Sequence, residues 1–159
     1  MKSEILCYSR CDIAFIEGGM IVSEAISDAA SSAHERAIGV CVRRFYERAR
    51  QDPLLSPVFK AAIADWEHHL ERIQDFWSRA LLGTERYSGF PYPAHLQLPI
   101  EPEHFSRWVA LFEETAVETL PPSLAGKAIE RARHMSTCFQ SGIFPFTDKD
   151  GRPSRLPPA

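Results

Sequence analysis

The sequence lacks the signature motifs of several large enzyme classes. It contains no HExxH, Walker, GxGxxG or GxSxG pattern. The sequence therefore gives no support for a metalloprotease, nucleotide-binding or serine-hydrolase function. Its four cysteines form neither a CxxC pair nor a CxxCH motif. Neither a zinc ribbon nor covalent c-type haem attachment is therefore supported.

Clusters of one charge and long apolar stretches are also missing. The 18 basic and 21 acidic residues give a formal net charge of -3 and are interspersed, which argues against a nucleic-acid partner. No apolar run approaches the roughly 18 residues that span a bilayer. The nearest N-terminal candidate, residues 13–22, is broken by Glu17, Gly18 and Gly19. We therefore expect a cytoplasmic protein with no membrane partner.

No stretch alternates polar and apolar residues for long enough to be a strand, so the 159 residues predict one all-α domain. Apolar residues spaced by three and four predict helices over about 35–50, 66–82 and 123–142, and from Pro102 to the Pro121-Pro122 break. A weak helix over 23–33 and a short element after Pro53 complete the set. The predicted organisation is an N-terminal extension over 1–33, partly disordered or weakly helical, a globular domain over 34–144 and a disordered tail over 145–159.

Two histidines stand out from the other polar residues. His69 lies on the apolar face of the 66–82 helix, where an unpaired imidazole would cost roughly 1 to 3 kcal/mol, so it needs a hydrogen-bond partner or a ligand. His95 sits in a segment stiffened by prolines, with Ala94, Leu96 and Leu98 around it. Such an apolar setting keeps imidazole neutral and able to donate a lone pair to a metal. One imidazole holds an iron tightly only when a porphyrin already grips that iron.

A carboxylate-bridged di-iron centre is the competing metal site. It needs two Glu-x-x-His pairs and two further inward carboxylates, and the candidates are Asp65 with His68 and Glu101 with His104. Both pairs are poorly placed, because His68 lies off the apolar face and Glu101 stands at a helix start before Pro102. The haem arrangement is therefore favoured.

Several segments resemble the group III truncated haemoglobins of bacteria. They are FYERARQDPLLSPVF at 45–59, DWEHHLERIQDFWSRALLGTERYSG at 65–89, AHLQLPI at 94–100 and HFSRWVALFEET at 104–115. With the last helix, they cover about two thirds of the chain. The resemblance implies a truncated globin fold, a two-over-two helical sandwich with a short irregular proximal region, that binds haem b (iron protoporphyrin IX).

Carried over by position, the resemblance makes His95 the proximal iron ligand. It places Tyr46, Trp108 and His69 on the distal side, where His69 could act as a gate that swings between pocket and solvent. It also makes four apolar residues contacts of the cofactor: Phe59, Ile73, Leu98 and Trp66.

The resemblance implies a pentacoordinate iron that binds oxygen, nitric oxide or carbon monoxide. Hydrogen bonds from Tyr46 and Trp108 to an oxygen ligand with partial negative charge would each contribute on the order of 1.5 to 3 kcal/mol, which slows its release. Slow release suits nitric oxide dioxygenation or peroxidase-like chemistry with an unknown reductase better than oxygen transport. The alternative is a cofactor-free helical interaction module, against which the polar groups of His95, Tyr46 and Trp108 argue.

Overall fold

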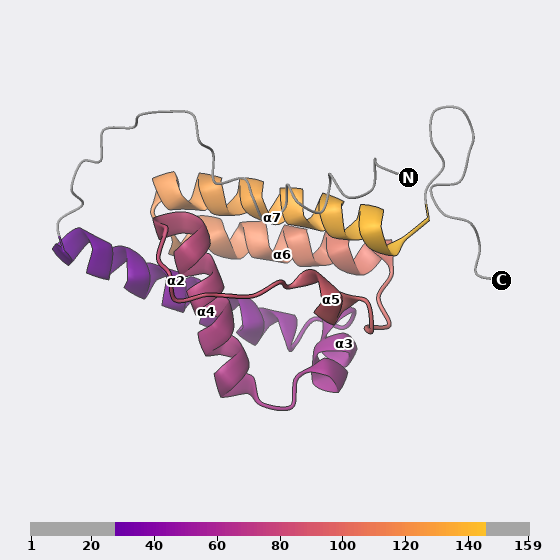
Figure 1. Ribbon diagram of the computed structural model, residues 1–159. Coiled ribbons are helices and arrows are strands. Elements are labelled where there is room, and N and C mark those ends of the chain that lie inside the picture. Colours follow the sequence, from indigo (N-terminus) through magenta and orange to yellow (C-terminus); the bar gives the residue numbers. More distant parts are fainter. Residues whose placement is uncertain (1–27, 146–159) are drawn as a thin grey trace, which may run out of the picture.

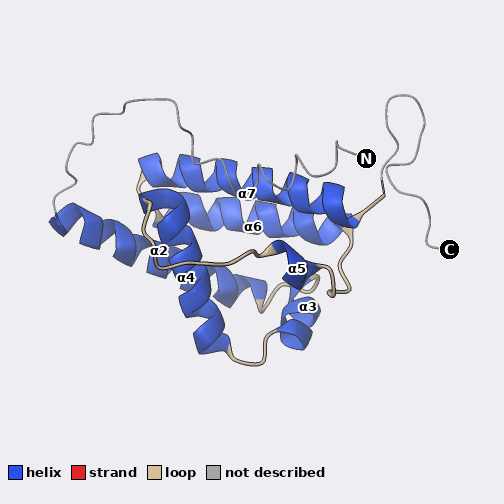
Figure 2. Cartoon of the chain, viewed as in Figure 1, coloured by secondary structure: helices blue, strands red, loops and turns tan. Residues whose placement is uncertain are grey.

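Every regular element in the computed structural model is a helix within residues 28–145, the part of the chain that the structure describes (Figures 1 and 2). The helices are α2 (Asp28–Ala49), α3 (Leu55–Ala62), α4 (Trp66–Leu82), α5 (Tyr92–His95), α6 (Pro102–Thr119) and α7 (Pro122–Ile143). The predicted all-α class is confirmed. Most of the predicted N-terminal extension and nearly all of the predicted tail lie outside the described residues.

Two helix pairs form the body of the fold. α6 and α7 lie side by side, while α2 and α4 pack on each other and cross beneath them (Figure 1). α2 contacts α6 and α4 contacts α7, so each pair covers the other. In Figure 1 the short helices α3 and α5 are seen below the right-hand part of α6 and α7. No helix of the described range is long and apolar enough to cross a bilayer.

The buried faces of the long helices follow the predicted periodicity. Residues spaced by three and four on α2 are at most 3% exposed: Ile38, Cys41, Val42, Phe45 and Ala49. They belong to one hydrophobic cluster with the apolar faces of α4, α6 and α7, in which α2 itself contacts α4 and α6. Burial of these faces, rather than intrinsic helix propensity, supplies most of the stability of such helices.

Local capping signals set the ends of α4. The carboxylate of Asp65 accepts a hydrogen bond from the backbone N–H of His68 at 3.1 Å, which caps the N-terminus. Gly83 ends the helix with φ of 74°, a left-handed conformation that glycine adopts without strain. Both ends agree with the prediction.

Two helices are longer than predicted. α2 runs without a break from Asp28 through the segment predicted as a separate weak helix. The Ser32 hydroxyl in that segment accepts a hydrogen bond from Arg36 at 2.9 Å, so it does not compete for the backbone. α3 continues past Pro57, which is tolerated because it lies in the first turn, where the backbone N–H has no partner within the helix.

Asp52 joins the start of α3 to α6. Its Oδ1 accepts hydrogen bonds from the backbone N–H groups of Leu54 and Leu55 at 3.0 and 3.1 Å. Its Oδ2 accepts one from Nε of Arg107 at 2.6 Å. Burial alone would raise the pKa of Asp52, but these hydrogen bonds outweigh it and hold the pKa below 3.8. The carboxylate is therefore ionised at neutral pH.

Asp52→Ala is expected to lower the free energy of unfolding by about 1 to 2 kcal/mol through loss of the cap. Loss of the ion pair adds less, because Arg107 is 43% exposed and regains water. Urea denaturation of the full chain measures the effect. Asp52→Asn, which keeps an acceptor for the cap, should be intermediate, and an Asp52→Ala protein as stable as wild type would contradict this role.

Candidate functional site

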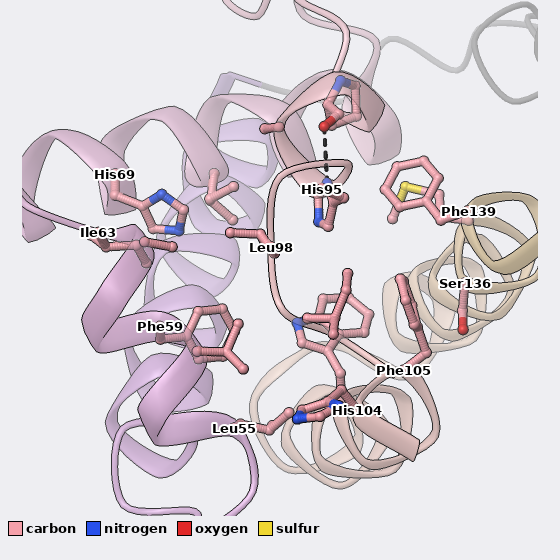
Figure 3. A pocket seen from close by; sticks show the side chains of 18 of the residues that line it. Leu55, Phe59, Ile63, His69, His95, Leu98, His104, Phe105, Ser136 and Phe139 are labelled. Atoms are coloured by element: carbon pink, nitrogen blue, oxygen red, sulfur yellow. Dashed lines mark hydrogen bonds between the residues drawn. The ribbon is translucent and has the colours of Figure 1, made fainter. Parts of the chain in front are cut away.

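A cavity of about 360 Å³ lies between the two helix pairs and the short helices (Figure 3). This size is within the range of small-molecule and cofactor sites. Most of its lining is apolar, and the side chains that carry a polar atom are few: Tyr46, His69, Trp77, Tyr87, His95, His104, Trp108 and Ser136. An apolar cavity with a few polar groups can bind a mainly hydrophobic ligand in one orientation.

His95 stands at the last position of α5. Its Nδ1 lies 2.9 Å from the carbonyl oxygen of Pro91. A carbonyl only accepts, so Nδ1 carries the proton and Nε2 keeps its lone pair. Figure 3 shows the other ring nitrogen turned away from this bond, toward the cavity. Burial lowers the pKa of His95, although the Pro91 bond opposes this, so the ring is neutral at pH 7 and is a ready metal ligand.

The α5 turn is fixed by close packing against α7. Tyr92 is buried in a cluster with Phe105 and Phe139. The ring of Phe139 lies 5.5 Å from that of Tyr92 and 4.8 Å from that of His95, measured between ring centroids. A Cβ at Gly142 would lie only 2.5 Å from the Tyr92 hydroxyl oxygen. The absence of a side chain at Gly142 therefore lets Tyr92 approach α7 and sets the position of His95.

Tyr46 and His69 form a hydrogen-bonded pair on α2 and α4. The Tyr46 hydroxyl oxygen lies 2.8 Å from Nε2 of His69. Burial raises the pKa of Tyr46, so the phenol keeps its proton. Burial, and then the positive charge of Arg72, lower the pKa of His69, so its ring is neutral. When Nε2–H donates to the phenol oxygen, the phenol O–H is free to donate to a third group.

Trp108 reaches the same cavity from α6. Its ring stacks on Phe112 with centroids 5.2 Å apart and an interplanar angle of 2°, and the edge contact with Phe45 is 5.3 Å. This packing fixes the indole plane. Tyr46 and Trp108 therefore bring two neutral hydrogen-bond donors to one cavity.

Seven of the eight predicted site residues line this cavity: Tyr46, Phe59, His69, Ile73, His95, Leu98 and Trp108. Trp66 is not among the lining residues. Its ring packs instead against the outer side of the distal pair, with centroids 5.9 Å from Tyr46 and 6.2 Å from His69.

Tyr87 and His104 also line the cavity and were not predicted as residues of a haem site. Tyr87 follows no helical periodicity, because it lies in the segment between α4 and α5. His104 is one turn before Trp108 on α6, and this spacing could have indicated it. Its Nδ1 accepts a hydrogen bond from the backbone N–H of Glu101 at 2.9 Å.

The two carboxylate–histidine pairs considered for a di-iron centre are both helix N-terminal motifs. Asp65 caps α4, and His104 accepts the backbone N–H of Glu101 at the start of α6. Within residues 28–145, no group of three or more histidine, cysteine, aspartate or glutamate side chains is placed to hold a metal ion. The geometry therefore offers no support for the di-iron alternative.

A hydrogen-bond network, here called the tether, holds the segment between α4 and α5. The Ser78 hydroxyl donates to Glu35 of α2 at 2.6 Å and lies 2.8 Å from the hydroxyl of Thr84. Arg86 donates to Glu35 at 2.6 Å and to Asp75 of α4 at 2.9 Å. Ser78 is fully buried. The tether thus anchors the start of the segment that leads to His95 on α2 and α4.

The lowered pKa values of His69 and His95 predict a pH dependence of stability. Both rings bind protons less readily in the folded state than at the ordinary pKa of 6.5. Below about pH 6.5 the unfolded chain therefore holds more protons, and stability falls as pH falls. His95 contributes at most about 1.4 kcal/mol per pH unit, and His69 less because its ring is nearer solvent.

Thermal unfolding between pH 7 and pH 5 measures this effect. The buried carboxylate of Asp52 has a pKa below 3.8, so it loses its contribution only in more acid solution. His69→Leu should reduce the pH dependence in this window. A melting temperature that is constant or rises as pH falls from 7 to 5 would show that the rings are not held neutral.

Comparisons with known proteins agree on one family. The family model described as bacterial-like globin matches residues 33–143. The chain is 32% identical over 118 residues to the group 3 truncated hemoglobin ctb of Campylobacter jejuni, covering 71% of this chain and 93% of that protein. The crystal structure of the group III truncated hemoglobin from the same organism superposes with a TM-score of 0.65. That match has 32% identity and covers 69% of this chain and 91% of the other.

Proposed function

Because the chain belongs to the bacterial-like globins and, among them, to the group III truncated haemoglobins, we propose that it binds haem b with a pentacoordinate iron. The ligands would be oxygen, nitric oxide or carbon monoxide. One observation carries the proposal. The imidazole of His95 is neutral, its Nδ1–H is held by Pro91, and its remaining nitrogen faces an apolar cavity. This hydrogen-bonded arrangement is typical of a histidine that ligates a metal.

The residues of the cavity suit a porphyrin. A haem that is not covalently linked needs an axial ligand and apolar side chains on both faces. His95 would supply the ligand, and Phe59, Ile73 and Leu98 would supply apolar contacts, since all three line the cavity. Trp66 is not proposed as a contact, because it is not among the residues that line the cavity.

The distal groups suit a ligand that carries partial negative charge. Haem iron supplies the coordination site and exchanges one electron when it is bound. Tyr46 would donate its phenol hydrogen and Trp108 its indole hydrogen to the outer atom of the ligand. His69 would orient the phenol through the 2.8 Å contact. Two charge-assisted donors favour slow release of oxygen.

Slow release favours chemistry on bound oxygen over oxygen transport. We propose nitric oxide dioxygenation, in which nitric oxide, dioxygen and one electron give one nitrate ion. The electron would come from a reductase, so a redox partner is implied. Peroxidase-like activity is the second candidate, and the same donors favour it because they can hydrogen-bond to a peroxide.

An absorption spectrum of the purified protein, before and after addition of haem, tests the cofactor. A Soret band, and a ferrous spectrum typical of five-coordinate iron, are expected. A chain that gives no Soret band after haem addition would instead be a cofactor-free helical module. Mixing the oxygenated protein with nitric oxide and measuring nitrate then tests the reaction, and a yield well below one nitrate per haem would exclude dioxygenation.

A further inference from the structure

A stack of side chains covers the outer side of His69. Trp66, the first residue of α4, lies edge-on to both rings of the distal pair, Tyr46 and His69. The guanidinium carbon of Arg50 lies 4.5 Å from the centroid of the Trp66 ring. Arg50 follows the last residue of α2, so this cation–π contact joins the end of α2 to the start of α4.

Trp66 and His69 stand three residues apart on α4, and their ring centroids are 6.2 Å apart, so the two side chains are neighbours on one face of the helix. Side chains on a helix lean toward its N-terminus, so the ring of His69 lies over the turn that begins with Trp66, three residues earlier. Outward rotation of His69 would break its hydrogen bond to Tyr46 and push against the indole. The indole also contacts Arg50, so the three side chains form a continuous series of contacts.

We propose that Arg50 and Trp66 form a latch that holds His69 against Tyr46 and limits how often the distal side of the cavity opens. Trp66 is then a positioning residue for His69 and does not touch the cofactor. The effect of the latch on ligand entry rests on the proposed haem function. The effect of the latch on the exposure of His69 is independent of haem, because every contact of the latch joins two side chains of the protein.

Flash photolysis of the carbon monoxide complex of the ferrous protein measures how fast carbon monoxide binds again. This association rate constant reports how often the distal side of the cavity opens. Arg50→Gln removes one exposed cation–π contact and should raise the association rate constant about two- to fivefold. Trp66→Leu also removes both ring-edge contacts and should raise it about tenfold. Arg50→Lys retains a cation over the ring and should restore a rate close to wild type.

Arg43→Gln is the matched control. Arg43 also joins α2 to α4, through a 3.3 Å ion pair with Glu67, but this exposed pair is not part of the latch. Its loss removes the same charge near the start of α4 and should leave the rate constant unchanged. Equal rate increases for Arg43→Gln and Arg50→Gln would overturn the proposal, because charge alone would then explain them.

A double-mutant comparison separates the latch from a general loosening of the fold. In a His69→Leu protein there is no imidazole to hold, so adding Arg50→Gln should have no further effect. A latch effect of the same size with and without His69 would overturn the proposal.

Histidine modification tests the latch without a ligand reaction. Diethyl pyrocarbonate modifies exposed imidazole, and peptide mass spectrometry with fragmentation distinguishes the exposed His68 from the half-buried His69. The ratio of His69 to His68 modification should rise about two- to fivefold in Arg50→Gln and stay constant in Arg43→Gln. An unchanged ratio in Arg50→Gln would overturn the latch. A raised ratio in protein that binds no haem would retain the latch and reject the haem function.

Discussion

His95→Ala is expected to have the largest effect of any single substitution, because it removes the proposed bond between the chain and the haem iron. Loss of a partner that only orients a metal ligand already lowers metal affinity by 10- to 100-fold. Loss of the ligand itself should therefore lower haem affinity by at least about 100-fold. Transfer of haem to an acceptor protein and the ferrous absorption spectrum measure this loss.

A small ligand in solution provides the decisive control. In His95→Gly, added imidazole should enter the vacated space, bind the iron and restore the wild-type ferrous spectrum. His104→Ala removes another histidine from the same cavity, and it should leave that spectrum unchanged. If His95→Ala kept a histidine-ligated spectrum while His104→Ala lost it, the assignment of the proximal ligand would be wrong.

Tyr46→Phe is expected to speed the release of oxygen by about 10- to 100-fold, since a charge-assisted hydrogen bond contributes roughly 1.5 to 3 kcal/mol. The reason is specific to the hydroxyl. The ring of Tyr46 packs on Phe59 and Trp66 with centroids 5.4 and 5.9 Å apart, and phenylalanine keeps both contacts. Stopped-flow displacement of oxygen by carbon monoxide measures the release rate.

Trp108 and His69 provide graded comparisons for this prediction. Trp108→Leu removes the second donor and should speed release by a similar factor. His69→Leu keeps both donors but loses the group that orients the phenol, so its effect should be smaller. Unchanged oxygen release in both Tyr46→Phe and Trp108→Leu would contradict the proposed role of the distal donors.

The sequence predicted those features that depend on near neighbours in the chain. The bounds of α4 agree with the 66–82 predicted from apolar spacing, and they are set locally by Asp65 and Gly83, because a cap and a left-handed glycine act within one turn. The choice of His69 over His68 followed from helical periodicity, and the structure leaves His68 exposed and brings His69 to the cavity. The start of α2 was predicted wrongly. Helix propensities of single residues do not take account of a side-chain hydrogen bond such as that between Ser32 and Arg36.

Contacts between distant segments could not be predicted in the same way. Tyr46 and His69 meet because α2 and α4 pack together. Periodicity predicts which face of each helix is buried, but it does not predict which residues of the two helices contact each other. Trp66 shows the limit most clearly. The resemblance implied a cofactor contact, whereas in the structure its ring contacts Tyr46 and His69 and is not among the residues that line the cavity.

The tether of Glu35, Ser78, Thr84 and Arg86 has a consequence for how the protein acquires its cofactor. All of its hydrogen bonds join protein groups, so the start of the segment that leads to His95 is held in place by the chain itself. A segment without regular helix would otherwise have to lose conformational entropy at the moment of binding. We therefore expect this part of the chain to be ordered before haem binds, which would lower the entropy cost of binding.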